Sequence, residues 1–322
     1  IHNLQISEKL LSFVDNELLK DLDILPEKFW QGFDKAVHEL APTNQALIKK
    51  REELQKKIDD WHIKNKGKEI VISEYKKFLK EITYLIEEGP DFKIETDNVD
   101  EEISKIAGPQ LVVPIMNARY TLNAANARWV SLYDSLYGTN IIESDEGGSE
   151  RYDPLRGQEV IKYVREFFDK YIPIDGISWK DISGLKIEKK DLVILKDDKI
   201  YKLKDKDKFI GHRGDASKPS AVIIKNNNLH FEIIINPKAF SAAHDIAGIS
   251  DVIAESAVST ICDNEDSVAA VDYEDKIICY KNWLGLMKGD LKIQFEKNGK
   301  NLERKLNPDR SFISKDGQGL KL

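Results

Sequence analysis

Residues 107–138 read AGPQLVVPIMNARYTLNAANARWVSLYDSLYG, and this stretch sets the expected fold. One-third of the whole chain is charged, but the only charges here are Arg119, Arg128 and Asp134. The short apolar run Leu111–Ile115 predicts a strand that is buried on both faces. The residues that follow it are small and polar. A buried strand that leads into such a segment is typical of the floor of a binding site in an α/β protein.

A second stretch further along the chain has the same organisation. The run Ser259–Cys262 ends in five polar or acidic residues, Asp263–Ser267. Such a run is typical of a barrel strand whose functional residues follow its carboxyl end. A region with mixed helix and strand patterns separates the two stretches, so we predict that one domain is interrupted by another.

The N-terminal region, from Leu4 to about Gly89, has a lysine-rich helical pattern. Pro26 is suited to the first turn of a helix, and apolar residues then repeat at helical spacing. We expect Ala41-Pro42 to end this helix and Thr43 to cap a long second one. The aromatic and leucine stripe is interpreted as core packing, which makes this region a helical arm.

Between the two stretches, the period of the apolar residues changes from helical to strand-like. We expect a helical lead around residues 252–257, before the second stretch. Asn226-Asn227-Asn228 and Lys297-Asn298-Gly299-Lys300 are predicted hairpin turns. The other predicted elements are a helix over Leu155–Tyr171 and strands over Leu192–Leu195, Ala221–Ile224, Leu229–Ile235 and Leu291–Phe295.

The composition excludes several classes of function. The net charge is −7 with both signs interspersed, so no broad basic face for nucleic acid is expected. No apolar run is long enough for a membrane span, and no leader is visible. Cys262 and Cys279 are the only cysteines and no Asn-x-Ser/Thr acceptor occurs, which favours a cytoplasmic location. The two cysteines are interpreted as small buried residues.

Two kinds of side chain are candidates for chemistry. Asp263, Glu265 and Asp266 offer the oxygen ligands that Mg²⁺ prefers, although such a cluster is also common in a solvated turn. Arg119 and Arg128 are suited to phosphate, because the guanidinium group donates two parallel bonds and stays charged. The alternative for each arginine is a structural ion pair, and Arg304 and Arg310 have the same two interpretations. The histidines form no zinc motif.

Three segments together resemble malate synthase of the G isoform. They are the opening stretch from Ala107, EDSVAAVDYEDKIICYKNWLGLMKG from Glu265 and RKLNPDR from Arg304. FWQGFDKAVHELAP and FIGHRGDASKP show weaker similarity to the same family. The resemblance implies an α/β fold, a (β/α)8 TIM barrel of which only the first strands are present here. It also implies an N-terminal helical clasp, an α/β domain inserted into the barrel and a C-terminal helical plug.

By this resemblance, the expected domains follow one another along the chain. The clasp covers residues 1–88, and the linker with the first barrel strand covers 89–128. The inserted α/β domain covers 129–255 and the second barrel strand region 256–288. Residues 289–322 return to the inserted domain, and the chain ends before the rest of the barrel.

The resemblance also implies the activity and the residues that serve it. The family condenses acetyl-CoA with glyoxylate and water to give malate and CoA in the glyoxylate cycle, with Mg²⁺. Five residues match family positions that bind acetyl-CoA: Val112, Arg119, Tyr120, Ser267 and Arg304.

Glu265 and Asp266 match acidic residues beside the metal, which they are expected to contact through its waters. The catalytic residues are expected downstream of Leu322, so this portion alone is predicted to be incomplete for catalysis. Either a longer product or a separate second chain would supply them, and the full-length enzyme is expected to be a monomer. An acyl-CoA lyase with the related barrel and a non-catalytic CoA-binding or interaction fragment remain the alternatives.

Overall fold

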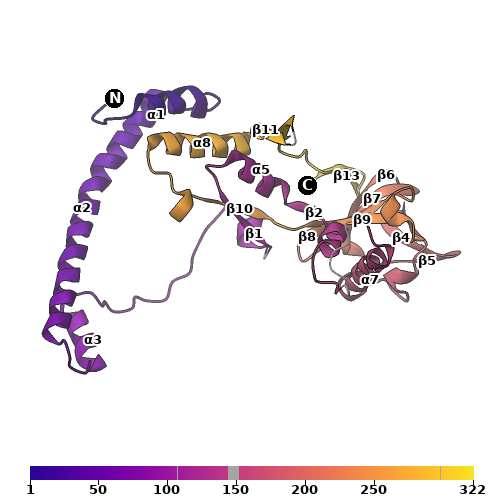
Figure 1. The fold of residues 1–322 in the computed structure, drawn as a ribbon, viewed down its shortest axis with the longest axis horizontal. Helices are drawn as coiled ribbons and strands as arrows, with labels where there is room; N and C mark the ends of the chain where they lie inside the picture. The colour runs from indigo at the N-terminus through magenta and orange to yellow at the C-terminus, as the bar shows by residue number, and fades with distance from the viewer. Residues whose placement is uncertain (107, 144–151, 298) are drawn as a thin grey trace. The chain divides into compact units, whose positions relative to one another are not determined.

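The computed structural model describes residues 1–106, 108–143, 152–297 and 299–322 (Figure 1). The chain forms two compact units. The first comprises residues 1–97 together with 272–277, and the second comprises 98–271 together with 278–322.

The first unit is helical. It contains α1 (Glu8–Phe13), a short π-helix (Val14–Leu18), α2 (Pro26–Lys64) and α3 (Ile72–Glu81). Trp30 on α2 is 3% exposed, and its Nε1 donates to Asp15 Oδ1 at 2.8 Å. Trp30 of the aromatic stripe is therefore packed at the start of α2, as predicted, whereas Phe33 of the same stripe is 48% exposed.

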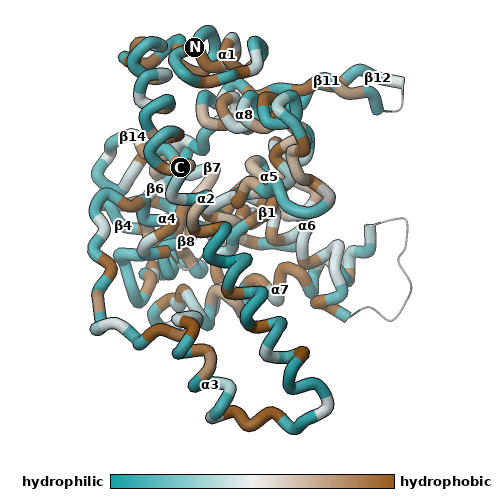
Figure 2. Tube along the Cα trace, turned by 90° about the vertical axis from the view of Figure 1, so that its left-hand side faces the viewer, coloured by the Kyte–Doolittle hydropathy of each residue, from teal (hydrophilic) through white to brown (hydrophobic). Residues whose placement is uncertain are grey.

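The structure corrects the prediction that Ala41-Pro42 ends the first helix. α2 continues through Pro42 to Lys64 as one helix of 39 residues. A proline removes one backbone hydrogen bond and crowds the preceding turn, which favours a helix end but does not require one. Here packing holds both ends of the helix, because the rings of Trp61 on α2 and Tyr75 on α3 lie 4.5 Å apart. Along α2, Figure 2 shows mostly hydrophilic residues with isolated hydrophobic ones.

The second unit contains an antiparallel sheet of seven strands, in the order β14-β13-β6-β7-β8-β9-β2. The sheet joins strands from three separate parts of the chain, and the last part follows residue 310. In chain order the strands are β2 (Trp129–Ser131), β6 (Phe209–Asp215), β7 (Lys218–Asn226), β8 (Leu229–Ile235), β9 (Ile249–Glu255), β13 (Ser311–Ser314) and β14 (Gly319–Lys321).

Helix α7 (Pro154–Tyr171) and a smaller sheet complete the main core of this unit. Val164, Phe168 and Trp179 have no exposed surface and belong to one cluster with Ile224 of β7 and Ile233 of β8. The smaller sheet has the order β3 (Gly184–Glu188), β4 (Asp191–Lys196) and β5 (Lys199–Tyr201).

Local sequence predicted much of this core. The helix over 155–171 and the strands over 192–195, 221–224 and 229–235 are confirmed. Asn227 and Asn228 have positive φ angles of 50° and 64°, as a tight hairpin turn between β7 and β8 requires. Strands β11 (Lys292–Lys297) and β12 (Lys300–Lys305) pair as predicted, although Asn298 of their turn lies outside the described residues.

The predicted helical lead around residues 252–257 is wrong, because residues 249–255 form β9. Val252 and Ile253 pair with Ile233 and Glu232 of β8, so the apolar residues serve both faces of an inner strand. A short apolar run fits a helix or a buried strand equally well by its spacing alone. Here the pairing with β8 favours the strand over the helix.

Strands β1 (Gln110–Pro114) and β10 (Ser259–Asp263) form a separate parallel pair, with Val113 opposite Cys262. The strand itself was predicted, but its burial on both faces is wrong, since Val112 is 63% exposed. Among the described residues β10 is the one strand that pairs with β1, so the other edge of β1 has no partner strand. The remaining helices of this unit are α4 (Glu101–Ser104), α5 (Ala118–Asn126), α6 (Leu132–Tyr137) and the larger part of α8 (Tyr273–Lys288).

The observed fold class is mixed α/β. The described residues show two parallel strands of the expected type and not a closed barrel. The predicted domain boundaries at residues 88, 128, 255 and 288 stay predictions. In the part of the chain that the structure describes, every helix is too short or too polar to cross a membrane.

Candidate functional site

The candidate site begins where β1 ends. Asn117 follows the strand and caps α5, because its Oδ1 accepts a hydrogen bond from Tyr120 N at 3.2 Å. The cap places Arg119 and Tyr120 in the first turn of α5, and 54% of Tyr120 is exposed. Two of the residues predicted to bind acetyl-CoA therefore lie side by side at the carboxyl end of a parallel strand.

A third predicted residue, Arg304 of β12, reaches the same place. The guanidinium carbon of Arg119 lies 4.6 Å from the ring centre of Phe295, and that of Arg304 lies 5.7 Å from it. Arg304 Nη1 also donates a hydrogen bond to Asn123 Oδ1 on α5. Two like charges are thus held beside one aromatic ring, and an anion between them would be attracted by both.

Side chains that were not predicted to have a role keep this group together. Phe295 supplies the ring, and Asn123 orients Arg304. Asn126, one turn later on α5, donates from Nδ2 to Lys305 O at 2.9 Å. The sequence marks the asparagines of the opening stretch only as polar residues, since their partners are far away along the chain.

Val112 lies on β1, opposite Ile261 of β10. Both are exposed, by 63% and 47%, and form a small apolar surface on the parallel pair. Its exposure leaves Val112 accessible to a ligand. Whether it contacts acetyl-CoA stays a prediction.

The acidic residues after β10 form a tight turn. Asp263 Oδ1 accepts a hydrogen bond from Glu265 N at 3.0 Å, and Asp266 has a positive φ of 50° at the start of a short 3-10 helix. Glu265 and Asp266 are exposed. Asp263 lies opposite Pro114 in the parallel pair, so this turn and the start of α5 share one edge. The side chain of Ser267 lies outside the described residues, so its predicted role is not tested.

The same turn is the predicted magnesium site. The described residues include no group of three or more His, Cys, Asp or Glu side chains that could hold a metal ion. Asp263 already accepts a backbone hydrogen bond, and the two other carboxylates lie in water. These residues do not fit a complete set of direct ligands, since Mg²⁺ requires near-ideal octahedral geometry. Two exposed carboxylates are compatible with contact through bound water.

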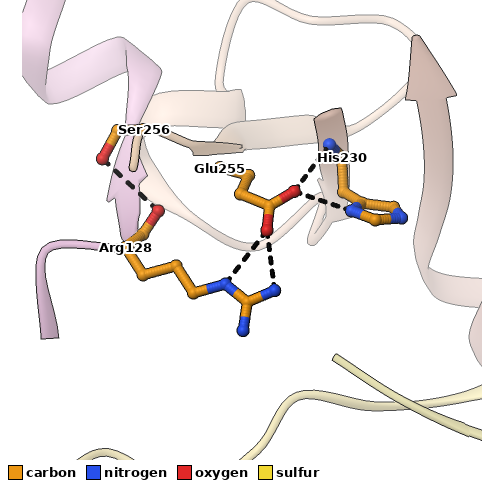
Figure 3. Close-up of polar contacts among 4 residues, drawn as sticks. All are labelled: Arg128, His230, Glu255 and Ser256. Atoms are coloured by element: carbon orange, nitrogen blue, oxygen red, sulfur yellow. Dashed lines mark hydrogen bonds and ion pairs between the residues drawn. The ribbon is translucent and has the colours of Figure 1, made fainter. Parts of the chain in front are cut away.

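Arg128 has a different role from Arg119. Its Nε and Nη2 donate to Glu255 Oε1 at 3.0 and 2.7 Å, while Glu255 Oε2 accepts from His230 N at 3.1 Å and lies 2.7 Å from His230 Nδ1 (Figure 3). Burial alone would raise the pKa of Glu255, but these hydrogen bonds outweigh burial and lower it. Arg128 is therefore in a structural ion pair, one of the two interpretations of its sequence.

Arg310 is also in an ion pair. Its Nη1 donates to Glu232 Oε2, and Arg213 Nη2 lies 2.6 Å from Glu232 Oε1. The Glu232 side chain has no exposed surface. The four arginines that the sequence left ambiguous thus separate into two pairs: Arg119 with Arg304 at Phe295, and Arg128 with Arg310, each on a buried glutamate.

The cysteines agree with their structural interpretation. Cys279 is buried and Cys262 is partly buried, and in the part of the chain that the structure describes neither forms a disulfide. Burial raises the pKa of the Cys262 thiol, which disfavours the reactive thiolate.

These features define a mixed α/β chain with a helical N-terminal unit and an arginine pair at the end of a parallel strand. Comparison with known proteins matches two parts of this chain to family models. Residues 9–70 match the family model "Malate synthase, N-terminal domain", and residues 152–226 match "Malate synthase G, alpha-beta insertion domain".

Similarity to malate synthase G extends over the whole chain. The chain is 46% identical to malate synthase G of Corynebacterium glutamicum over 321 residues, which are 99% of this chain and 43% of the relative. It is 46% identical to that of Halalkalibacterium halodurans over 326 residues, which cover 100% of this chain and 45% of the relative. It is 44% identical to malate synthase G of Corynebacterium efficiens over 325 residues, which cover 100% of this chain and 43% of the relative. The predicted resemblance is therefore confirmed, and the chain spans less than half the length of these relatives.

Proposed function

We propose that this chain supplies the acetyl-CoA-binding part of a malate synthase, which condenses acetyl-CoA with glyoxylate and water to malate and CoA. The observation that carries the proposal is the meeting of Arg119 and Arg304 at Phe295, beside Tyr120. Three residues expected from the resemblance to bind the same ligand come together from segments far apart in the sequence. The names of the relatives supply the reaction.

The arrangement suits the phosphate-bearing part of acetyl-CoA. Among the described residues Arg119 makes no side-chain hydrogen bond and Arg304 makes one, to Asn123, so both guanidinium groups keep donors for a ligand. Arginine binds phosphate with two parallel hydrogen bonds. The contact with Asn123 fixes Arg304, so less side-chain freedom is lost when ligand binds. The exposed ring of Tyr120 offers a surface on which the adenine of CoA would stack.

The proposal includes Mg²⁺, which Glu265 and Asp266 would contact through its waters. The ion would polarise the aldehyde of glyoxylate. The residues of this chain would bind and orient acetyl-CoA. No proton transfer is assigned to any of them.

Calorimetric titration of residues 1–322 with acetyl-CoA tests the binding role. A charge-assisted hydrogen bond contributes about 1.5–3 kcal/mol, so Arg119→Met and Arg304→Met should each weaken binding about 10- to 100-fold. Arg51→Met, on the exposed part of α2, is the matched control and should have no effect. Equal affinities for all three variants and the unaltered chain would refute the binding role.

Turnover is best tested in a chain of the relatives' length, with glyoxylate, acetyl-CoA and Mg²⁺. Malate and free CoA are the expected products. Cleavage of a malyl thioester without net malate formation would instead identify an acyl-CoA lyase. The same assay on residues 1–322 tests the expectation that this portion alone is incomplete, and a CoA signal close to that of the longer chain would contradict it.

A further inference from the structure

A cavity of about 780 Å³ lies in the second unit, between the end of α5, β2 and the segment that leads from β12 to β13. None of the residues expected to bind acetyl-CoA lines it. Its charged lining consists of Arg128, Arg213, Arg310 and Asp309. The side chains of the lining therefore have an excess of two positive charges, although the chain as a whole is acidic.

Two buried carboxylates that lie outside the cavity lining hold the arginines in place. Glu232, whose side chain is 0% exposed, pairs with Arg213 and Arg310, and Glu255, whose side chain is 3% exposed, pairs with Arg128. Neither glutamate lines the cavity. Buried carboxylates of this kind fix the guanidinium groups, so their remaining donors need no reorganisation to bind a ligand.

Each arginine keeps free donors. In the described residues Nη1 of Arg128, Nη1 of Arg213 and Nη2 of Arg310 make no hydrogen bond and are not buried. Figure 3 shows the third nitrogen of Arg128 directed away from Glu255. The side chains of the three arginines are 40%, 41% and 27% exposed, so solvent and small solutes reach them.

Trp129 gives the cavity a rigid wall. The guanidinium carbons of Arg128 and Arg310 both lie 5.4 Å from its ring centre. Stacking on the indole limits the motion of both groups and keeps their edges available for hydrogen bonds. Convergent arginine edges are the usual partners of phosphate and carboxylate groups.

We propose that this cavity binds a small oxyanion, a phosphate or a carboxylate group, through the free guanidinium nitrogens of Arg128, Arg213 and Arg310 against Trp129. The site is independent of the acetyl-CoA role, because it shares no residue with it. Binding at this cavity requires no metal ion, and it does not depend on the proposed reaction.

Chemical labelling of the unaltered chain tests the proposal without any variant. Phenylglyoxal modifies accessible arginines, and peptide mass spectrometry gives the labelling rate of each one. The probes are inorganic phosphate and malonate at about 10 mM, with sodium chloride at the same ionic strength as the blank. By mass action, a twofold slowing at this concentration corresponds to a dissociation constant of about 10 mM.

We expect phosphate or malonate to slow the labelling of Arg128 and Arg310 at least about twofold, while Arg51 on α2 is unaffected. Protection by phosphate alone assigns the site to phosphate groups, protection by malonate alone assigns it to carboxylates, and protection by both supports the shared oxyanion chemistry. Less than about twofold slowing by either probe would overturn the proposal, and so would equal slowing at Arg51.

Arg310→Lys is the matching variant. It keeps a positive charge beside Glu232 but removes the free nitrogens of the guanidinium group. Protection of Arg128 by the anion should then fall below about twofold, whereas Arg51→Lys should leave it unchanged. Undiminished protection in a folded Arg310→Lys protein would contradict the role of Arg310. If that variant does not fold, the labelling of the unaltered chain still decides the proposal.

Discussion

Glu232 is a carboxylate whose side chain is 0% exposed, and it lies between Arg213 and Arg310. Converting both arginines to methionine keeps much of their packing volume but leaves the carboxylate without a charged partner. Breaking a buried ion pair in this way costs about 3–5 kcal/mol, because the remaining charge is desolvated and unpaired. We expect the double variant to lose this amount of unfolding free energy in the seven-stranded sheet.

The reverse change should be much less costly. Glu232→Gln takes the charged partner from Arg213 and Arg310. Their side chains are 41% and 27% exposed, so both charges stay hydrated. We expect a loss of about 1–2 kcal/mol. Adding Glu232→Leu to the double arginine variant removes the unpaired charge and should restore most of the lost stability, since a hydrophobic replacement of a buried ion pair is often neutral.

Hydrogen exchange of peptides from β7 and β8 measures this sheet separately from the helical unit. A loss of 3–5 kcal/mol corresponds to exchange about 100- to 4,000-fold faster when the opening equilibrium sets the exchange rate. We expect the double arginine variant to be the least stable of the three and Glu232→Gln to be intermediate. The triple variant with Glu232→Leu should be the most stable. A triple variant as unstable as the double variant would refute it, because the loss could not then come from the unpaired carboxylate.

Three further changes test other parts of the structure. Gly211→Ala would place a Cβ 2.5 Å from the carbonyl oxygen of Ile313, so we expect it to cost about 1–3 kcal/mol and to speed hydrogen exchange in β13; Gly319→Ala, with open space around it, should not. Pro42→Ala should stabilise α2 by up to about 3 kcal/mol in thermal unfolding followed at 222 nm, and an equal effect of Pro26→Ala at the first turn would contradict this. The lowered pKa of Glu255 means that its stabilising contribution is present above pH 4.5 and is lost as the pH falls through the folded pKa. The difference in melting temperature between wild type and Glu255→Gln should therefore shrink below pH 4.5, and a constant difference would argue against it.

Local sequence was sufficient where an element is defined by its own residues. Pro154–Tyr171 has a regular apolar repeat and a proline at its first turn, and the asparagines at 226–228 permit the positive φ angles of a tight turn. The same kind of pattern failed for residues 252–257, where pairing with β8 overrides the local spacing. It failed again at Pro42, where packing at both ends of α2 compensates for one missing hydrogen bond.

The candidate site was less accessible to local reasoning. Arg119 and Arg304 were assigned through the family resemblance, and nothing in either segment indicates that they meet at Phe295. The different roles of Arg119 and Arg128 could not be predicted, because the partner of Arg128 is Glu255, 127 positions away in the sequence. A pattern of residue types indicates which side chains can bind an anion. Tertiary structure decides which of them are already paired with a carboxylate and which remain available.

Ser256 donates two hydrogen bonds to Arg128 O, from its backbone N at 2.7 Å and from Oγ at 3.3 Å, and Figure 3 shows the second. They join two positions near the ends of the long stretch between β1 and β10. Trp129 and Glu255 pair directly beside these bonds. The stretch therefore leaves the parallel strands and returns to them at nearly one point. The entropic cost of closing a loop rises only slowly with its length, and a folded insertion whose ends touch removes most of that cost. Loops within this stretch can therefore change in length without separating β1 from β10, whereas the sheet as a whole also requires β13 and β14 from residues 311–321.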